Sequence, residues 1–186
     1  MKNVLLYLSA FIPMYILIIV KQSIEMIVGN IKTNWLNFLV LGLLLSVIIL
    51  GLVGLNLEIR HRKEQTSKIK IVEKQNSTDQ HFLGYFSLFV LFAISFDLSK
   101  ISMLVIFIAI ITMIGVVYVK NKLFYINPFL NILGFNFYDI TYTVEGDSTK
   151  QTTKIFFKGD LILNRYYYVK IKDENFNFLD KKLKSN

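Results

Sequence analysis

Residues 35–55 read WLNFLVLGLLLSVIILGLVGL and contain no charged side chain. A helix crosses the hydrocarbon layer of a membrane with roughly 20 consecutive apolar residues, or about 17 to 25 when tilted. Three further uncharged stretches lie at Val4–Val20, Phe82–Phe96 and Ile101–Val119. The pattern predicts an α-helical membrane protein with four transmembrane helices.

Composition agrees with a membrane protein. Apolar residues make up 54% of the chain and charged residues 18%, and the charges gather between the apolar stretches. This separation is typical of integral membrane proteins and not of a soluble domain. The first stretch ends at Val20–Lys21 without a small-residue cleavage site, so we expect a retained span and not a signal peptide.

The basic residues predict the orientation. Of the 21 lysines and arginines, 18 lie in the N-terminus, the loop 56–81 or the tail from Lys120, and the others are Lys21, Lys32 and Lys100. Because basic residues mark cytoplasmic loops, both termini are expected in the cytoplasm, with the spans in the cell's inner membrane. Topology and attraction to anionic membrane lipid then explain the net charge of +8 without direct binding of nucleic acid.

Two domains are predicted. Residues 1–122 would form a four-helix transmembrane domain carrying the cytoplasmic loop 56–81. In that loop, Glu64 and Lys68 have the i, i+4 spacing of a helical ion pair, which predicts that residues 57–73 extend the second span as a helix. Residues 123–186 alternate polar and apolar side chains, which predicts a small cytoplasmic antiparallel β domain, a β-meander.

The expected strands of this meander are separated by turn sequences such as Glu145-Gly146-Asp147-Ser148. They cover Phe135–Val144, Thr152–Phe157, Leu161–Ile171 and Phe176–Leu179. A sheet of this size has a marginal core of its own, so we expect it to pack against the loop or against neighbouring copies of the chain.

Small residues on the second span are candidates for helix packing, namely Gly42, Ser46, Gly51 and Gly54. Small side chains let helix backbones approach closely within a membrane. They fit either packing within one subunit or the interface of a homo-oligomer.

A cluster in the tail is a candidate for binding a partner protein: Arg165, Tyr166, Tyr167 and Tyr168. Tyrosine and arginine are favoured at the energetic centres of protein interfaces. The alternative is that alternate tyrosines of the triplet pack inward.

No catalytic motif occurs in the sequence: there is no phosphate-binding glycine loop, no Gly-x-Ser-x-Gly elbow and no His-Glu-x-x-His. There is no cysteine, and the two histidines, His61 and His81, stand at opposite ends of one loop. The spans also lack the central ionisable side chains that transporters need. We therefore expect no enzyme activity, no cofactor and no metal site.

Residues 124–140 read FYINPFLNILGFNFYDI and join the last apolar stretch to the first strand. Pro128 would end a helix, and Gly134 would allow a sharp bend. This block, which combines Asn127, Pro128, Leu130, Gly134 and Tyr138 after a fourth span, resembles the KwaA family, the membrane subunits of the Kiwa anti-phage defence system. Phe135 departs from the pattern, which has tyrosine there.

The resemblance implies a homotetrameric sensor that detects phage-associated disturbance of the envelope and works with a cytoplasmic DNA-binding partner, KwaB. The residues by themselves leave two other functions open. One is an oligomeric pore or effector that depolarises the cell, like membrane accessories of CRISPR systems, and the other is a bacteriocin immunity protein. For the sensor, we expect residues 127–134 to form a rigid joint between membrane and tail.

Overall fold

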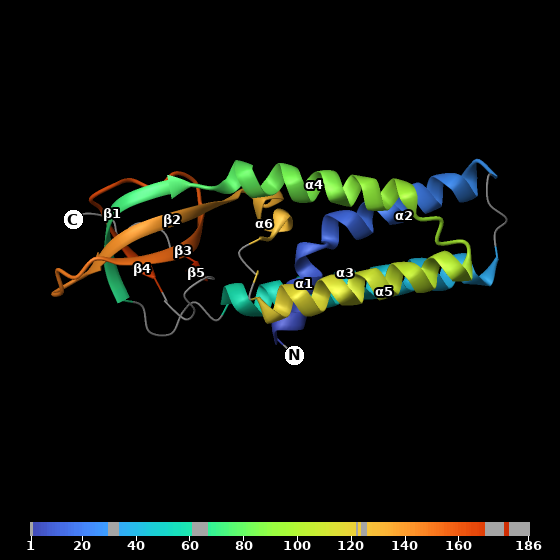
Figure 1. Cartoon of the computed structure of the whole chain (residues 1–186), viewed down its shortest axis with the longest axis horizontal. Coiled ribbons are helices and arrows are strands. Elements are labelled where there is room, and N and C mark those ends of the chain that lie inside the picture. Colours follow the sequence, from blue (N-terminus) through green and yellow to red (C-terminus); the bar gives the residue numbers. More distant parts are fainter. Residues whose placement is uncertain are drawn as a thin grey trace.

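A computed structural model describes residues 2–29, 34–60, 67–121, 123, 126–169 and 177–178. The molecule is elongated, with a helical bundle at one end and a curled sheet at the other (Figure 1). The helices are α1 (Lys2–Ala10), α2 (Ile12–Ile27), α3 (Trp35–Arg60), α4 (Thr78–Ser95), α5 (Ile101–Lys120) and α6 (Pro128–Ile132). The strands are β1 (Ser67–Asn76), β2 (Phe135–Val144), β3 (Gln151–Lys158), β4 (Tyr166–Val169) and β5 (Asn177–Phe178).

Two helices, α3 and α5, are each long and apolar enough to cross a membrane. The pair α1 and α2 makes a third if it counts as one bent span, whereas the apolar part of α4, Leu83–Ser95, is shorter. Length and composition therefore support two or three of the four predicted spans.

The first apolar stretch is not one straight helix. Its two halves, α1 and α2, meet at Phe11 and are bent by 50°. Pro13 explains the break, because proline has no N–H to donate to the carbonyl of Ser9 and its ring crowds that carbonyl. The bend lets α1 pack against α3 and α5 while α2 packs against α3 and α4.

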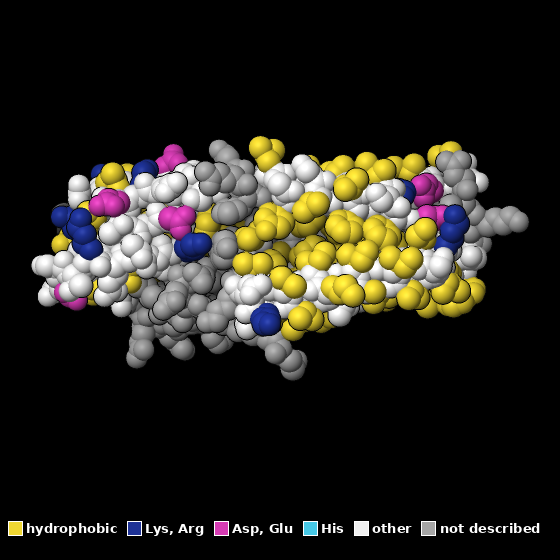
Figure 2. Space-filling model, viewed as in Figure 1, with side chains coloured by type: hydrophobic (Ala, Val, Ile, Leu, Met, Phe, Trp, Pro, Cys, Tyr) yellow, Lys and Arg dark blue, Asp and Glu magenta, His cyan; other side chains and the backbone are white. Residues whose placement is uncertain are grey.

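The bundle is covered with apolar side chains. Figure 2 shows them over the helices, with charged side chains gathered over the sheet and at the far tip of the bundle. At that tip, Lys21 donates to the main-chain carbonyls of Ile94 and Phe96 at 2.9 and 3.0 Å, and Asp97 pairs with Lys100 at 3.1 Å. An apolar belt between two charged ends is the surface that a bilayer matches.

The loop between α3 and α4 contributes a strand, so the predicted helix over 57–73 is wrong for residues 67–73. Residues 67–76 form β1, which lies between β2 and β4. Ile69 and Ile71 are fully buried, and the lysines beside them point away from the core. This alternation has the period of a strand and was a stronger signal than the i, i+4 charge spacing. Glu64, the other member of that spacing, lies outside the described residues.

The sheet is not a meander, and that prediction is also wrong. Its order is β4-β1-β2-β3-β5, so β1 separates β4 from the other tail strands. Four strands are antiparallel, and β5 runs parallel to β3 at the edge. The sheet is therefore built from two parts of the chain that lie on either side of α4 and α5.

Two cores hold the molecule together, one in the bundle and one inside the curled sheet. They meet through β2 and β3. Phe137 and Phe156, whose rings lie 5.2 Å apart, belong to the bundle core, whereas their neighbours Tyr138 and Ile155 belong to the sheet core. Because adjacent strand residues face opposite sides, one pair of strands serves both cores.

Candidate functional site

The joint, defined here as residues 127–134, lies where bundle and sheet meet (Figure 1). It consists of the N-cap Asn127, helix α6 and Gly134. Pro128 occupies the first turn of α6, where its missing N–H costs no hydrogen bond. The Asn127 side chain accepts a hydrogen bond from the Leu130 N–H at 3.3 Å and so caps the helix.

Asn127 also bonds to the other end of the chain. Its amide Nδ2 donates to the Oγ of Ser9 at 3.0 Å, and Ser9 in turn donates to the carbonyl of Leu6 at 2.7 Å. Asn127 is 3% exposed and Ser9 is 0% exposed, so this contact is closed to water. One side chain therefore caps α6 and ties it to the last turn of α1.

A second hydrogen bond fixes the joint to α5. The buried hydroxyl of Tyr118 donates to the carbonyl of Ile126 at 2.6 Å, just before the joint. On the other side, Gly134 has φ +81°, a conformation that side chains disfavour, and its N–H donates to the carbonyl of Asn131 at 2.9 Å. The chain thereby ends α6 and turns directly into β2.

The remaining predicted joint residues lie in different cores. Leu130 is fully buried in the bundle core, and Tyr138 is in the sheet core. The Tyr138 hydroxyl donates to the carbonyl of Gly159 at 3.2 Å, and burial raises the pKa of this phenol. The structure thus places Asn127, Pro128, Leu130 and Gly134 together, with Tyr138 anchored in the sheet.

The four small residues predicted to pack helices, Gly42, Ser46, Gly51 and Gly54, form two pairs with different surroundings. A Cβ on Gly51 would lie 3.0 Å from the main-chain nitrogen of Ser9, and one on Gly54 would overlap the side chain of Leu5. A Cβ on Gly42 would meet nothing within 4 Å, and Ser46 is exposed. Gly51 and Gly54 therefore pack α1 against α3 within one chain, whereas Gly42 and Ser46 face outward.

A third close approach was missed by sequence reasoning. A Cβ on Gly115 would lie 2.9 Å from Cε1 of Tyr7, whose hydroxyl donates to the main-chain carbonyl of Ile111. A glycine inside an apolar helix is the signal that could have found it. Helix α1 thus packs closely against glycines of both α3 and α5.

Aromatic rings fill the bend between α1 and α2. Phe11 lies 5.1 Å from Phe89 of α4 and 6.4 Å from Tyr118 of α5, measured between ring centroids. Tyr7 completes the group at 4.9 Å from Phe11 and 5.4 Å from Tyr118. Phe11, at the break between α1 and α2, therefore packs against both α4 and α5.

The predicted tyrosine cluster also divides. Tyr167 is fully buried, and its hydroxyl accepts a hydrogen bond from the Ile162 N–H at 2.9 Å. Tyr166 is exposed, and the ammonium of Lys68 lies 4.8 Å from the centre of its ring. The outward candidates for a partner surface are therefore Arg165, Tyr166 and, half-buried, Tyr168.

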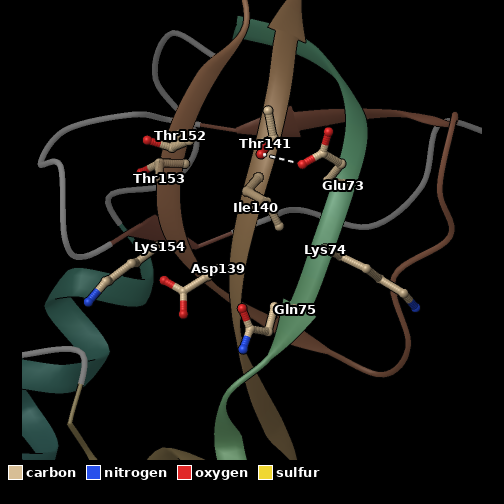
Figure 3. Close-up of a pocket in the computed structure, with 9 residues that line it drawn as sticks. All are labelled: Glu73, Lys74, Gln75, Asp139, Ile140, Thr141, Thr152, Thr153 and Lys154. Atoms are coloured by element: carbon tan, nitrogen blue, oxygen red, sulfur yellow. Dashed lines mark hydrogen bonds between the residues drawn. The ribbon is translucent and has the colours of Figure 1, made fainter.

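A hollow of about 610 Å³ lies on the outer face of β1, β2 and β3 (Figure 3). Its two carboxylates already have partners. Asp139 accepts from the Ser77 hydroxyl at 2.8 Å, and Glu73 pairs with Lys150 at 3.5 Å. Within the described ranges there is no group of three or more histidines and acidic residues placed to hold a metal ion.

These features define a class: a chain whose apolar helical bundle of membrane type is joined, through a buried polar link, to a curled sheet. The family is given by comparison, because the family model for the anti-phage protein KwaA matches residues 2–178. The chain belongs to the KwaA family. Searches of curated proteins and of solved structures return no match.

Proposed function

We propose that this chain is the membrane sensor of an anti-phage complex, with four spans, both termini in the cytoplasm and a sheet that engages a soluble partner of KwaB type. In this proposal it assembles as a homotetramer in the inner membrane. The role is non-enzymatic and involves neither a cofactor nor direct contact with nucleic acid. Family membership supports the defence role, and the apolar belt of the bundle supports the membrane location.

The arrangement of the chain supports the proposed topology. The start of α1 lies on the side of the bundle that faces the sheet (Figure 1). The sheet carries the lysines of β1 and β3, whereas the far tip of the bundle carries Lys21 and Lys100. A reporter active only in the cytoplasm, fused after Asn186, should be active. Activity of a periplasmic reporter at that position would contradict the topology.

The observation that carries the proposed relay is the hydrogen bond between Ser9 and Asn127. Helix α1 packs on α3 through Gly51 and Gly54 and on α5 through Tyr7, so a change in span packing displaces α1. Ser9 would pass that displacement to the joint, and the joint continues without a break into β2. A stimulus shifts such an equilibrium only if it stabilises one packing more than the other.

Ser9→Ala tests the relay, and Ser46→Ala is its matched control. Both serines donate to the carbonyl three residues earlier at 2.7 Å, but Ser9 additionally accepts from Asn127. Loss of that acceptor leaves a buried amide unpaired, which costs about 1–3 kcal/mol. We expect Ser9→Ala to insert normally but to lose phage protection and partner response, and Ser46→Ala to behave like the unmodified protein.

Membrane content and plaque counts are the measurements, because they separate insertion from signalling. Full protection by inserted Ser9→Ala and Asn127→Ala proteins would contradict the relay. Ion leakage from cells that express the chain alone, without its partner, would instead favour the pore function.

The partner surface needs a separate test. We expect Arg165→Glu to reduce recovery of the soluble partner in co-purification, because Arg165 is exposed beside Tyr166. Lys150→Glu is a control, since this exposed lysine lies in the ion pair with Glu73. Equal recovery with both variants would move the partner surface away from Arg165.

A further inference from the structure

An apolar cavity of about 190 Å³ lies between α4 and α5, beside the bend of the first span. Its buried wall includes Phe11 at the bend, Phe89 of α4 and Pro128 of the joint. Val117, which is 52% exposed, and the half-buried Tyr85 line it as well, so the cavity reaches the outer surface of the bundle. It therefore connects that surface with both the bend and the joint.

The size of the cavity selects its occupant. Cofactors and drug-sized ligands occupy pockets of roughly 300–1,000 Å³, which this cavity does not reach. A cavity of roughly 150 Å³ lined by Leu, Ile and Phe holds one benzene-sized apolar molecule. The space therefore fits a short run of hydrocarbon, and it opens at the exposed apolar side chain of Val117.

A lysine, Lys120, lies one helical turn beyond the opening of the cavity. Lys120 is exposed and lies three residues after Val117, so both are on one face of α5, with the lysine one turn nearer the sheet. A lysine at the end of a span reaches the headgroup layer with its ammonium. The cavity and Lys120 together present an apolar slot below a positive charge, which complements a phospholipid.

We propose that this cavity binds an acyl chain of an anionic phospholipid from the surrounding bilayer, with its phosphate at Lys120. The site rests on the membrane location proposed above and not on the relay. The bound chain contacts Phe11 and Pro128 at once, so lipid occupancy bears directly on the bend and on the joint. This gives the protein a contact through which the state of the bilayer reaches both elements.

The test uses the full chain in nanodiscs of phosphatidylglycerol that carries a photoreactive group on one acyl chain. After illumination and digestion, mass spectrometry maps the labelled residues. We expect labels on Tyr85, Phe89 and Ile114, and a loss of at least about tenfold in Val117→Trp, or about 1.4 kcal/mol in apparent binding.

Val116→Trp is the matched control, because Val116 is 62% exposed on the same helix and does not line the cavity. It should leave the labels unchanged. Lys120→Gln should lower the preference for phosphatidylglycerol over phosphatidylcholine while preserving the apolar slot. This variant still tests the proposal if Val117→Trp fails to insert.

Three results would overturn the proposal: labelling of cavity residues no stronger than that of Val116, equal labelling in the two tryptophan variants, or cross-links from the cavity to a second copy of the chain. None of these results depends on phage protection. A failed lipid site is therefore distinguishable from a failed relay.

Discussion

The bundle and the sheet treat their apolar side chains in opposite ways. In α3 and α5, large apolar residues such as Leu45, Ile49, Val105 and Met113 are exposed around much of the helix. In strands β1 to β4 and the described loops that join β2, β3 and β4, the exposed large apolar residues are Ile162, Leu163 and Tyr166, and the others are buried or half-buried. The sheet closes its own core, and the bundle leaves apolar surface for its surroundings.

This difference shows which contacts hold each half together. The bundle coheres around α1 and α2: α1 packs through close backbone approaches and the buried hydrogen bonds of Ser9, and α2 packs against α3 and α4. Its outer helices have apolar faces that match lipid or another subunit. The sheet is held by the ordinary burial of side chains away from water.

The sharpest way to break the sheet is at its core. Tyr167→Ala removes a fully buried ring that packs against Phe157 and accepts the Ile162 hydrogen bond. By analogy with other large aromatic truncations, we expect about 3–5 kcal/mol of destabilisation. Limited proteolysis of the solubilised protein should show early cleavage in β1 to β4. Tyr166→Ala, at an exposed position, should resist as well as the unmodified protein.

A charge placed on each exterior tests the comparison directly. Ile108→Lys puts an ammonium on an exposed face of α5, and Ile162→Lys does the same at the sheet end. A lysine at the centre of a span costs about 2.5–3.5 kcal/mol of insertion free energy, whereas a solvated one costs little. The membrane fraction should lose the first protein and keep the second. Equal membrane content would contradict the proposal that α5 spans the membrane.

The close approach of α1 to α3 predicts a smaller effect. Gly54→Leu forces a side chain into Leu5, and overpacking of this kind costs about 1–3 kcal/mol. Gly42→Leu on the same helix meets open space and should be nearly neutral. Thermal aggregation of the detergent-solubilised proteins measures both. If Gly42→Leu instead changed the oligomer size, the outward-facing Gly42 and Ser46 would lie in a subunit interface.

Acid should weaken the tip of the bundle by the smallest amount. A hydrogen bond from the Ser99 hydroxyl, aided by Lys100, lowers the pKa of Asp97. A carboxylate with a lowered pKa stabilises the folded state at pH values above its unfolded pKa of about 3.9. This stabilisation is lost as the pH falls through the folded pKa. Because the carboxylate is partly solvated, we expect no more than about 0.2–1 kcal/mol. Asp97→Asn should abolish this part of the pH dependence of the melting temperature.

Local patterns were sufficient for two of the four predicted spans and for strands β2 and β3. The uncharged runs at 35–55 and 101–119 gave α3 and α5 because a long apolar run without turn residues has few alternatives. The alternation in 135–144 gave β2 with the predicted bounds. The alternation around Ile69 and Ile71 likewise favours a strand over 67–76, but the i, i+4 charge spacing in the same loop favours a helix, so local patterns conflict there.

By itself, the sequence determined the long apolar segments, the bias of basic residues toward one side and the positions of Pro128 and Gly134 at the two ends of the joint. Composition and short-range sterics are enough to decide these features. Only the tertiary structure decided that Asn127 meets Ser9, that Gly51 and Gly54 receive α1, and that β1 enters the sheet. These contacts join segments far apart in the chain. Their partners are chosen by the packing of the whole molecule, which no local pattern encodes.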